Sequence, residues 1–367
     1  MGEPSLLARY RDPALLARLV GRLATLEPGR ELSFMHVCGT HENAIAKNGL
    51  RGLLPPWLRV IAGPGCPVCV CPPADIDLAV QLALDHGAIL ATYGDMVHVP
   101  GRVSLAEARA RGGDVRVVYG VADAVRVAGE NPDRPTVLLA VGFETTACTT
   151  AAALEADPPP SFSMLLSHRL IPPALRALLA MEEIRTDGFL LPGHVLTVTG
   201  SRPYEPIAEE SGLPMVVAGF EPVDILLGLL RLVEQALGEP RARGRVGNSY
   251  PRAVRREGNR RAVAAMERVF EPADARWRGL GSIPASGLRL REAYRGRDAL
   301  ERFAVDPDPD LPESLPGCLC AQVMVGLKEP EECGLFGAGC GPDTPRGPCM
   351  VSFEGTCRNR YLYQEQR

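Results

Sequence analysis

The chain has 367 residues, 46% hydrophobic and 23% charged, which is enough apolar side chain for two or three domains with real cores. A formal net charge of -4 gives no sign of a general nucleic-acid or anionic-membrane binder. Residues 5–26 carry Arg and Glu throughout, unlike a targeting signal, and no apolar run is long enough for a membrane span. We therefore expect a soluble, cytoplasmic protein that binds neither nucleic acid nor membrane.

Strand-like apolar runs alternate with helical patterns over the first two thirds of the chain. The predicted strands are 32–37, 58–62, 88–92, 115–119, 136–141, 162–166, 188–191 and 214–218. Residues 74–86 have apolar side chains at helical spacing, and Ser104 with Glu107 predicts a capping box. Such alternation is typical of parallel βαβ units whose sheet is covered by helices.

The strand ends at Val37 and Val141 look alike, which indicates two related α/β subdomains. We expect them to be divided near residues 129–135, a junction rich in charge and proline. The predicted organisation is a helical segment at 1–30 packing on the C-terminal domain, subdomains at 31–130 and 131–238, and a C-terminal domain at 239–367. Residues 241–261, with eight arginines, predict an exposed loop and then a helix, either as a solvated face or as a contact for an acidic partner.

Eleven cysteines are many for an intracellular protein, and they are unevenly distributed. Four lie between Cys38 and Cys71, Cys148 is alone, and six lie between Cys318 and Cys357. A secreted disulfide framework would need a signal peptide, so in a reducing compartment these clusters indicate metal binding or redox chemistry.

The first cysteine motif is Cys38-Gly39-Thr40-His41-Glu42, where a predicted strand turns into a helix. The positive end of the helix dipole is expected to favour the thiolate of Cys38, the form that binds iron. His41 and Glu42 supply a base and an acid within one turn. Open α/β sheets bind ligands at this edge, so we interpret the motif as functional rather than as packing.

The second motif places Cys66 and Cys69 in a C-x-x-C after the strand at 58–62. The spacing permits a readily reduced disulfide or half of a tetrahedral metal site. A structural zinc site would need two further ligands, and no nearby pair offers them. Because both strands end at the same sheet edge, we expect Cys66 to lie within about one loop length of Cys38.

The third group is the tail, which has six cysteines and no histidine: Cys318, Cys320, Cys333, Cys340, Cys349 and Cys357. An all-thiolate set favours a [4Fe–4S] cluster or zinc, and the absence of paired C-x-x-C knuckles favours the cluster. As ligands we expect the four with the spacing C-x14-C-x6-C-x16-C: Cys318, Cys333, Cys340 and Cys357. Cys320 and Cys349 remain as neighbouring or redox thiols.

Taken together, segments from residue 35 to 357 resemble the hydrogenase maturation factor HypD family, in the family's order. The segments are Cys38-Gly-Thr-His-Glu42, Gly63-Pro-Gly-Cys-Pro-Val-Cys69, Tyr93-Gly-Asp-Met96, Val99-Pro-Gly101, Gly142-Phe-Glu-Thr-Thr146, Pro192-Gly-His-Val195, Gly219-Phe-Glu-Pro222 and Cys349-Met-Val-Ser352. The resemblance implies two α/β domains plus a third with an iron–sulfur cluster. It also implies a complex with a HypC-type small chaperone and encounters with a HypE-type cyanide donor.

Carried onto this sequence, the resemblance makes Cys38 the ligand of a transient Fe(II) with cyanide and carbonyl ligands, beside His41 and Glu42. Cys66 and Cys69 become redox thiols. Cys71 departs from the expected pattern and is a spare thiol that could exchange with Cys69. The implied function is a redox-active scaffold on which the Fe(CN)2(CO) unit of [NiFe]-hydrogenases is assembled. The alternative is a thiol–disulfide reductase of the ferredoxin:thioredoxin reductase kind.

Other polar residues are weaker candidates. Asp95 and His98 follow the strand at 88–92 and could face the Cys38 cleft, although helix capping by Asp95 is an equal interpretation. Glu144 and Thr145 lie at the matching edge of the second subdomain, and His194 is either a neighbour of the site or a loop histidine. Cys148 is expected to be a buried structural cysteine.

Overall fold

The computed structural model describes residues 10–238, 244–308 and 310–363. All eight predicted strands form, and three further strands follow them. The strands are β1 (Leu32–His36), β2 (Leu58–Ala62), β3 (Ile89–Thr92), β4 (Val115–Val117), β5 (Thr136–Gly142), β6 (Phe162–His168), β7 (Gly188–Pro192), β8 (Met215–Ala218), β9 (Val246–Asn248), β10 (Phe270–Trp277) and β11 (Gly281–Leu290).

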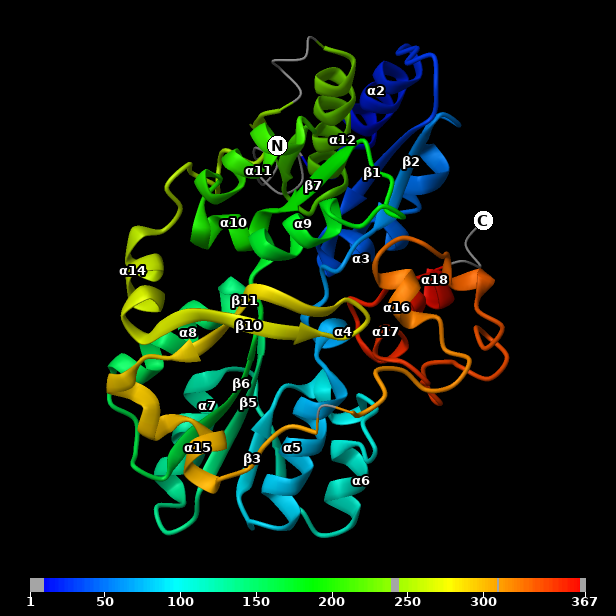
Figure 1. Cartoon of the computed structure of the whole chain (residues 1–367). Coiled ribbons are helices and arrows are strands. Elements are labelled where there is room, and N and C mark those ends of the chain that lie inside the picture. The colour runs from blue at the N-terminus through cyan, green and yellow to red at the C-terminus, as the bar shows by residue number, and fades with distance from the viewer. Residues whose placement is uncertain (1–9, 239–243, 309, 364–367) are drawn as a thin grey trace, which may run out of the picture.

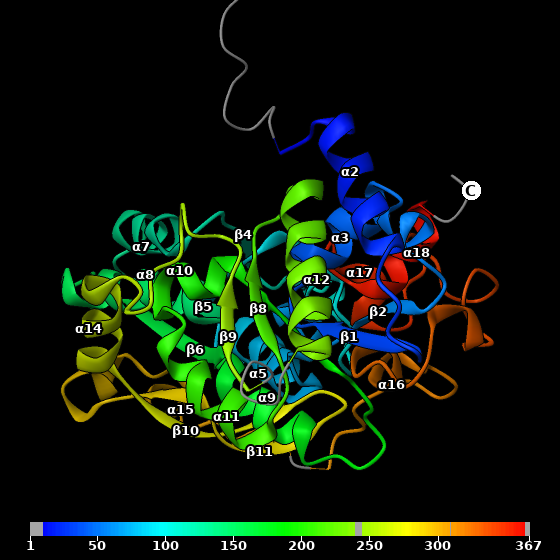
Figure 2. The same cartoon turned by 90° about the horizontal axis from the view of Figure 1, so that it is seen from above.

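Helices connect and cover these strands (Figures 1 and 2). They are α2 (Pro13–Ala24), α3 (Gly39–Lys47), α4 (Pro67–Val70), α5 (Pro73–Leu84), α6 (Leu105–Ala110), α7 (Val121–Glu130), α8 (Glu144–Glu155), α9 (Ile171–Leu179), α10 (Gly193–Thr199), α11 (Glu205–Ser211), α12 (Pro222–Leu237), α14 (Arg260–Val269), α15 (Ala299–Phe303), α16 (Cys320–Met324), α17 (Pro348–Val351) and α18 (Thr356–Tyr363). Short 3-10 turns are η1 (Leu50–Leu53), η2 (Gly94–His98), η3 (Arg202–Tyr204), η4 (Glu292–Arg297) and η5 (Pro330–Glu332). The predicted capping box of Ser104 and Glu107 begins α6.

Two parallel sheets organise the chain, as the alternation predicted. The first has the order β2-β1-β7-β8-β9 and the second has the order β4-β3-β5-β6. Figure 1 shows the first sheet above and the second below, with the hairpin of β10 and β11 crossing between them. Every residue of β5 is buried, which fits a strand covered by helices on both faces.

The predicted division between residues 130 and 131 does not match these sheets. β1 pairs with β7, and β3 pairs with β5, so each sheet draws strands from both sides of that boundary. The chain leaves the first sheet after β2, builds the whole second sheet, and returns at β7. The likeness of two short strand ends carries no information on which strands become neighbours. The boundary placed at the junction rich in charge and proline was therefore wrong.

The two outer boundaries also need correction. α2 packs against α12 and not on the C-terminal domain, since Leu19 and Leu23 share a core cluster with Val223 and Leu226. The apolar stripe of α2 is thus covered by another apolar helix. β9 belongs to the first sheet, so residue 239 is no structural boundary. Residues 1–9 of the predicted N-terminal segment and 364–367 of the predicted C-terminal domain lie outside the described residues.

The arginine-rich stretch forms a loop followed by α14, as expected from the sequence. Arg252 binds the buried Asp224 and lies between the rings of Tyr10 and Tyr250. Arg241 and Arg243 lie outside the described residues. No helix among the described residues is long and apolar enough to cross a lipid bilayer.

Candidate functional site

Cys38 lies two residues after β1 and immediately before the first turn of α3. It is only 7% exposed. The loop after β2 lies against it, because β1 and β2 are parallel neighbours and Gly39 N donates to Gly65 O over 2.8 Å. The predicted closeness of the two cysteine loops is therefore confirmed.

The expectation of a Cys38 thiolate is wrong for the metal-free protein. Burial, together with the nearby carboxylate of Glu354, raises the pKa of this thiol to about 12. Donors from Thr40 and His41 at the start of α3 oppose this shift but do not overcome it. Cys38 is thus a neutral thiol that a bound cation would deprotonate, since metal binding to cysteine releases the proton.

His41 and Glu42 lie behind Cys38 on α3, and both are buried. His41 Nε2 donates to Gly219 O over 2.9 Å, and burial lowers the pKa of its ring to about 3, so the ring is neutral. Glu42 accepts from Arg51 and from His36 Nε2 over 2.7 Å. Burial opposes ionisation of Glu42, but Arg51 and His36 hold the pKa of its carboxyl well below its usual range. Glu42 is therefore an anchored carboxylate and not an available acid.

An aromatic stack leads from His41 to the surface. The ring of Phe220 stacks on His41 with centroids 4.8 Å apart, and His194 stacks on Phe220 with centroids 3.6 Å apart. His194 itself is exposed. The expectation that His194 neighbours the site agrees with this arrangement, although it contacts His41 only through Phe220.

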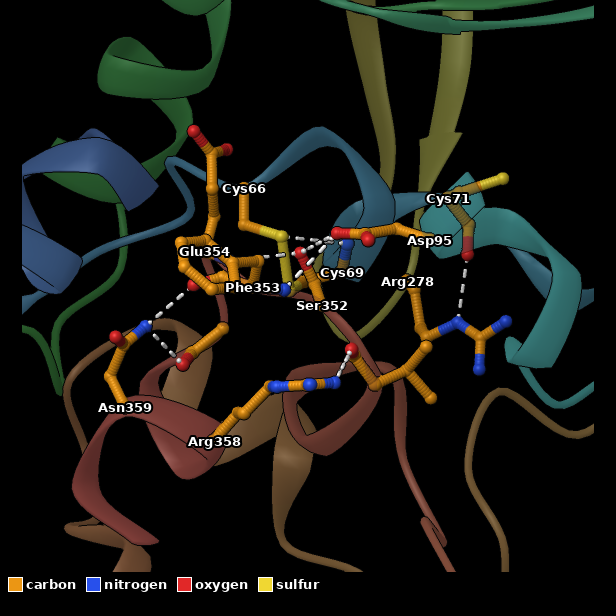
Figure 3. Close-up of a disulfide and its surroundings, with 12 residues drawn as sticks. Cys66, Cys69, Cys71, Asp95, Arg278, Ser352, Phe353, Glu354, Arg358 and Asn359 are labelled. Carbon is orange, nitrogen blue, oxygen red and sulfur yellow. Dashed lines mark hydrogen bonds between the residues drawn. A yellow bond between two sulfur atoms is a disulfide. The ribbon is translucent and has the colours of Figure 1, made fainter. Parts of the chain in front are cut away.

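A disulfide joins Cys66 and Cys69 (Figure 3). Both residues are buried, and Cys66 immediately precedes α4. The sulfur of Cys71 points away from this disulfide and lies 3.4 Å from Ser167 Oγ, in the core beside the second sheet. Burial, with Asp75 nearby, raises the pKa of the Cys71 thiol to about 12. Cys71 is therefore held apart from the exchange with Cys69 that the sequence suggested.

A loop of the tail closes over the start of α3. Glu354 Oε1 accepts from Thr40 Oγ1 over 2.7 Å, and a Cβ on Gly39 would lie 2.3 Å from Glu354 Cβ. Asp95 anchors the loop by accepting from Ser352 Oγ and Phe353 N, each over 3.1 Å. Asp95 thus reaches the Cys38 region through the tail, and Glu354 is a site residue that the sequence reasoning missed.

Two small cavities connect the Cys66–Cys69 disulfide with the tail cysteines, and the first of them reaches Gly39, next to Cys38. One, of about 10 Å³, is lined by the Cys66–Cys69 disulfide, His36, Glu42, Glu354 and Cys349, with Gly39, Gly63, Pro64, Met324 and Thr356. The other, also about 10 Å³, is lined by all six tail cysteines. Cys349 lines both cavities, so the disulfide and the tail thiols are neighbours.

Four of the six tail thiols are linked to one another by hydrogen bonds. Hydrogen bonds run from Cys318 through Cys320 and Cys349 to Cys357. The bond with Cys320, together with burial, raises the pKa of Cys318 far above its usual value. Cys340 Sγ accepts from Arg346 N over 3.3 Å. Among the described residues, no group of three or more His, Cys, Asp or Glu is arranged as a formed metal site. The structure does not separate four ligands from six, so the expected set stays a prediction.

The remaining candidates lie elsewhere. Glu144 is buried at the start of α8, where its Oε1 accepts from Ile171 N over 3.0 Å, and burial raises the pKa of its carboxyl to about 7. Thr145 is half-buried beside it, and His98 is exposed on η2. Cys148 is half-buried rather than buried, and its Sγ donates to Thr145 O.

Sequence comparisons place the chain among known proteins. Residues 14–364 match a family model described as "HypD: Hydrogenase formation hypA family". The hydrogenase expression/formation protein HupD of Azotobacter chroococcum is 46% identical, over 98% of this chain and 96% of the relative. Proteins named hydrogenase maturation factor HypD from Azotobacter vinelandii and Cupriavidus necator are 45% and 43% identical, over 98% and 97% of this chain and 96% of each relative. The chain belongs to the HypD family of hydrogenase maturation factors.

Proposed function

We propose that this protein acts in hydrogenase maturation, as the relatives' names state for them, and that it is the scaffold that holds the iron of the active-site unit during assembly. The supporting observation is the contiguity of three thiol groups. The Cys66–Cys69 disulfide and the six tail cysteines line two cavities that share Cys349. Gly39, the residue after Cys38, lines the cavity at the disulfide, and its N–H donates to Gly65 O in the loop before Cys66. The substrate is Fe(II) that carries cyanide and carbonyl ligands.

Cys38 supplies the anchor for this iron. A soft thiolate suits low-spin Fe(II), and one ligand from a strand end lets the iron depart when assembly is complete. The second thiolate comes from a HypC-type small chaperone, and a HypE-type protein donates the cyanide. His41, His36 and the anchored Glu42 hold the first turn of α3 in place behind the thiol.

The Cys66–Cys69 pair serves as a two-electron store beside the iron. Reduction of the disulfide to two thiols takes two electrons and two protons, and oxidation returns them. The residues at the disulfide are buried, so electrons must arrive through the protein. Cys349 is the tail cysteine that also lines the cavity at the disulfide.

The tail thiols fit a [4Fe–4S] cluster in donor type and number. Six sulfurs line one cavity, and four are enough to bind it. We infer that Cys318, Cys333, Cys340 and Cys357 hold the cluster, and that Cys320 and Cys349 lie between it and the disulfide. The cavity has room for about one water, so the thiol side chains must separate on loading. When bound, such a cluster supplies electrons one at a time.

The reductase alternative is less well supported by the geometry. A thiol–disulfide reductase must present its dithiol to the disulfide of a second protein. Cys69 is fully buried and Cys66 nearly so, beneath the tail loop that carries Glu354. We also propose a cytoplasmic location, which the reducing chemistry of free thiols requires.

Infrared spectroscopy tests the scaffold function. The protein is purified anaerobically with its small partner from cells that carry the maturation machinery. We expect absorption bands in the cyanide and carbonyl stretching region, lost when Cys38 is replaced by Ser and retained in Cys148→Ser. Absence of these bands, together with fast reduction of a thioredoxin-like protein, would contradict the scaffold and favour the reductase.

A further inference from the structure

Arg278 lies buried at the closed end of the hairpin, between α4 and the tail. Its side chain is 2% exposed. Nε donates to Cys71 O over 2.8 Å and Nη2 donates to Pro100 O over 3.1 Å, while its main-chain N–H donates to Val70 O. Figure 3 shows the guanidinium close to the end of α4, which carries the disulfide. All three acceptors are neutral carbonyl groups.

Among the residues that the structure describes, no carboxylate forms an ion pair with this guanidinium. Arg169, another buried arginine, has Asp75 at 3.3 Å. A buried charge without a counter-charge is strongly unfavourable, because carbonyl dipoles replace only part of the lost hydration. We therefore expect a negatively charged group to lie near Arg278 in the functional protein.

The thiols of the tail are the groups that can supply it. Burial lowers the pKa of Arg278, whereas Cys71, Cys320, Glu313 and Cys318 act in the opposite direction. Cys71 is a neutral thiol, and Glu313 already accepts from Gly279 N and from Arg276. Cys320 and Cys318 remain, and they lie in the cavity of six cysteines.

The hairpin is fixed against the helix that begins at Cys320. Gly279 has a left-handed φ of +81°, and a Cβ there would lie 2.7 Å from Ala321 Cβ and 3.3 Å from Met324 Cε. The adjacent Trp277 is fully buried and donates to Ser286 Oγ. This close packing holds the charge of Arg278 next to α16 and leaves it little freedom to turn toward solvent.

We propose that Arg278 is the internal counter-charge of the metal centre formed by the tail cysteines, and that it raises the reduction potential of that centre. This inference rests on the proposed [4Fe–4S] cluster. A cluster held by four thiolates is anionic, and it gains one more negative charge when it accepts an electron. A fixed positive charge stabilises the reduced form more than the oxidised form.

Potentiometric titration tests this assignment. Wild type, Arg278→Gln and Arg278→Lys are loaded anaerobically with iron and sulfide and titrated with dithionite through mediator dyes, with the reduced cluster followed by paramagnetic resonance. For Arg278→Gln we expect the equilibrium constant of one-electron reduction to fall on the order of tenfold, a shift of about 59 mV to lower potential. Arg278→Lys keeps the charge and should stay close to wild type.

Arg289→Gln is the matched control, because it removes the same charge from an exposed, ion-paired position on the same hairpin. Its potential should be unchanged. An unchanged potential in Arg278→Gln, or an equal fall in Arg278→Lys, would overturn the proposal.

Folding of the metal-free variants is measured first. If Arg278→Gln fails to fold without metal, whether or not Arg278→Lys folds, the residue serves the fold itself and the proposal is wrong. Zinc without sulfide in the wild type would instead refute the proposed cluster. A normal cluster whose reduction potential does not depend on Arg278 is a different result, and it refutes only the role of Arg278.

Discussion

The main chain of Gly65 lies directly on the main chain of Cys38. A Cβ on Gly65 would be 2.0 Å from Cys38 N and 2.3 Å from Cys38 Cα, closer than any side chain could fit. The thiol position is thus set by two neighbouring strand ends and a glycine, rather than by packing of the cysteine side chain. The same glycine precedes Cys66, so one loop positions both the anchor and the disulfide.

Gly65→Ala should disrupt this juxtaposition. We expect a loss of about 1–3 kcal/mol in the free energy of unfolding, because the added methyl group meets rigid main chain. Retention of cyanide-ligated iron should fall as well. Urea denaturation and iron analysis of the complex with the small partner measure the two effects. Gly52→Ala is the control, since a Cβ there meets nothing within 4 Å and should change neither quantity.

Cys38→Ser should abolish iron retention while leaving the fold and the tail metal intact. A serine hydroxyl is a harder and far less acidic donor than a thiol, so low-spin iron loses its anchor. We expect bound iron with cyanide ligands to drop more than about tenfold. Circular dichroism and sulfide analysis should match the wild type. Full retention of the ligated iron in this variant would falsify the role of Cys38.

Local sequence patterns were sufficient to predict the strands and the cysteines that follow them. Cys38 and Cys66 each follow a short apolar run, and parallel strands place such ends at one edge. The neighbour of β1 on its other side is β7, more than 150 residues later in the chain. No local sequence pattern encodes the pairing of β1 with β7, because the chain builds the whole second sheet between β2 and β7.

The site residues that the sequence analysis missed were also missed because their contacts are long-range. Glu354 meets Gly39 and Thr40 only because the tail folds back on α3, and Arg278 is one arginine in a turn. The thiolate expected for Cys38 was wrong because the helix dipole is a local effect, whereas burial depends on the tertiary structure. Sequence spacing also could not show that Cys349 lies at both cavities.

The tail should carry one [4Fe–4S] cluster in anaerobically purified protein. We expect four iron and four sulfide per chain beyond any iron at Cys38, with a brown colour, because four thiolates are the usual ligands of such a cluster. Cys333→Ser and Cys340→Ser should lose it, whereas Cys148→Ser should not. One zinc and no labile sulfide per chain would contradict this prediction.

Cys66 and Cys69 should cycle between disulfide and dithiol without Cys71. Thiol trapping after mild oxidation and reduction should reveal a two-electron change that is lost in Cys66→Ala and Cys69→Ala. Cys71→Ser should keep the change, because its sulfur contacts Ser167 in a different core cluster. A disulfide that involves Cys71, or a pair that stays inert at every accessible potential, would contradict the proposed two-electron store.

Glu144→Gln should remove part of the dependence of stability on pH. Burial raises the pKa of Glu144 from 4.5 to about 7 in the folded protein, and Oε2 has no partner among the described residues. Because the folded-state pKa is the higher one, the protonated carboxyl stabilises the fold fully below pH 4.5, and this stabilisation is lost as the pH rises through about 7. The difference corresponds to about 3 kcal/mol.

Glutamine keeps an oxygen for the N–H of Ile171 and cannot ionise. The wild type should therefore lose about 3 kcal/mol relative to Glu144→Gln between acidic and neutral pH, measured by urea denaturation across that range. Glu155→Gln is the control, because this carboxylate lies at the other end of α8, paired with Arg268. The group that faces Glu144 is Tyr204, a buried phenol whose pKa is raised by burial and by Glu144, so it stays neutral throughout. Parallel stability curves for the wild type and Glu144→Gln would show that Glu144 remains ionised in the folded protein.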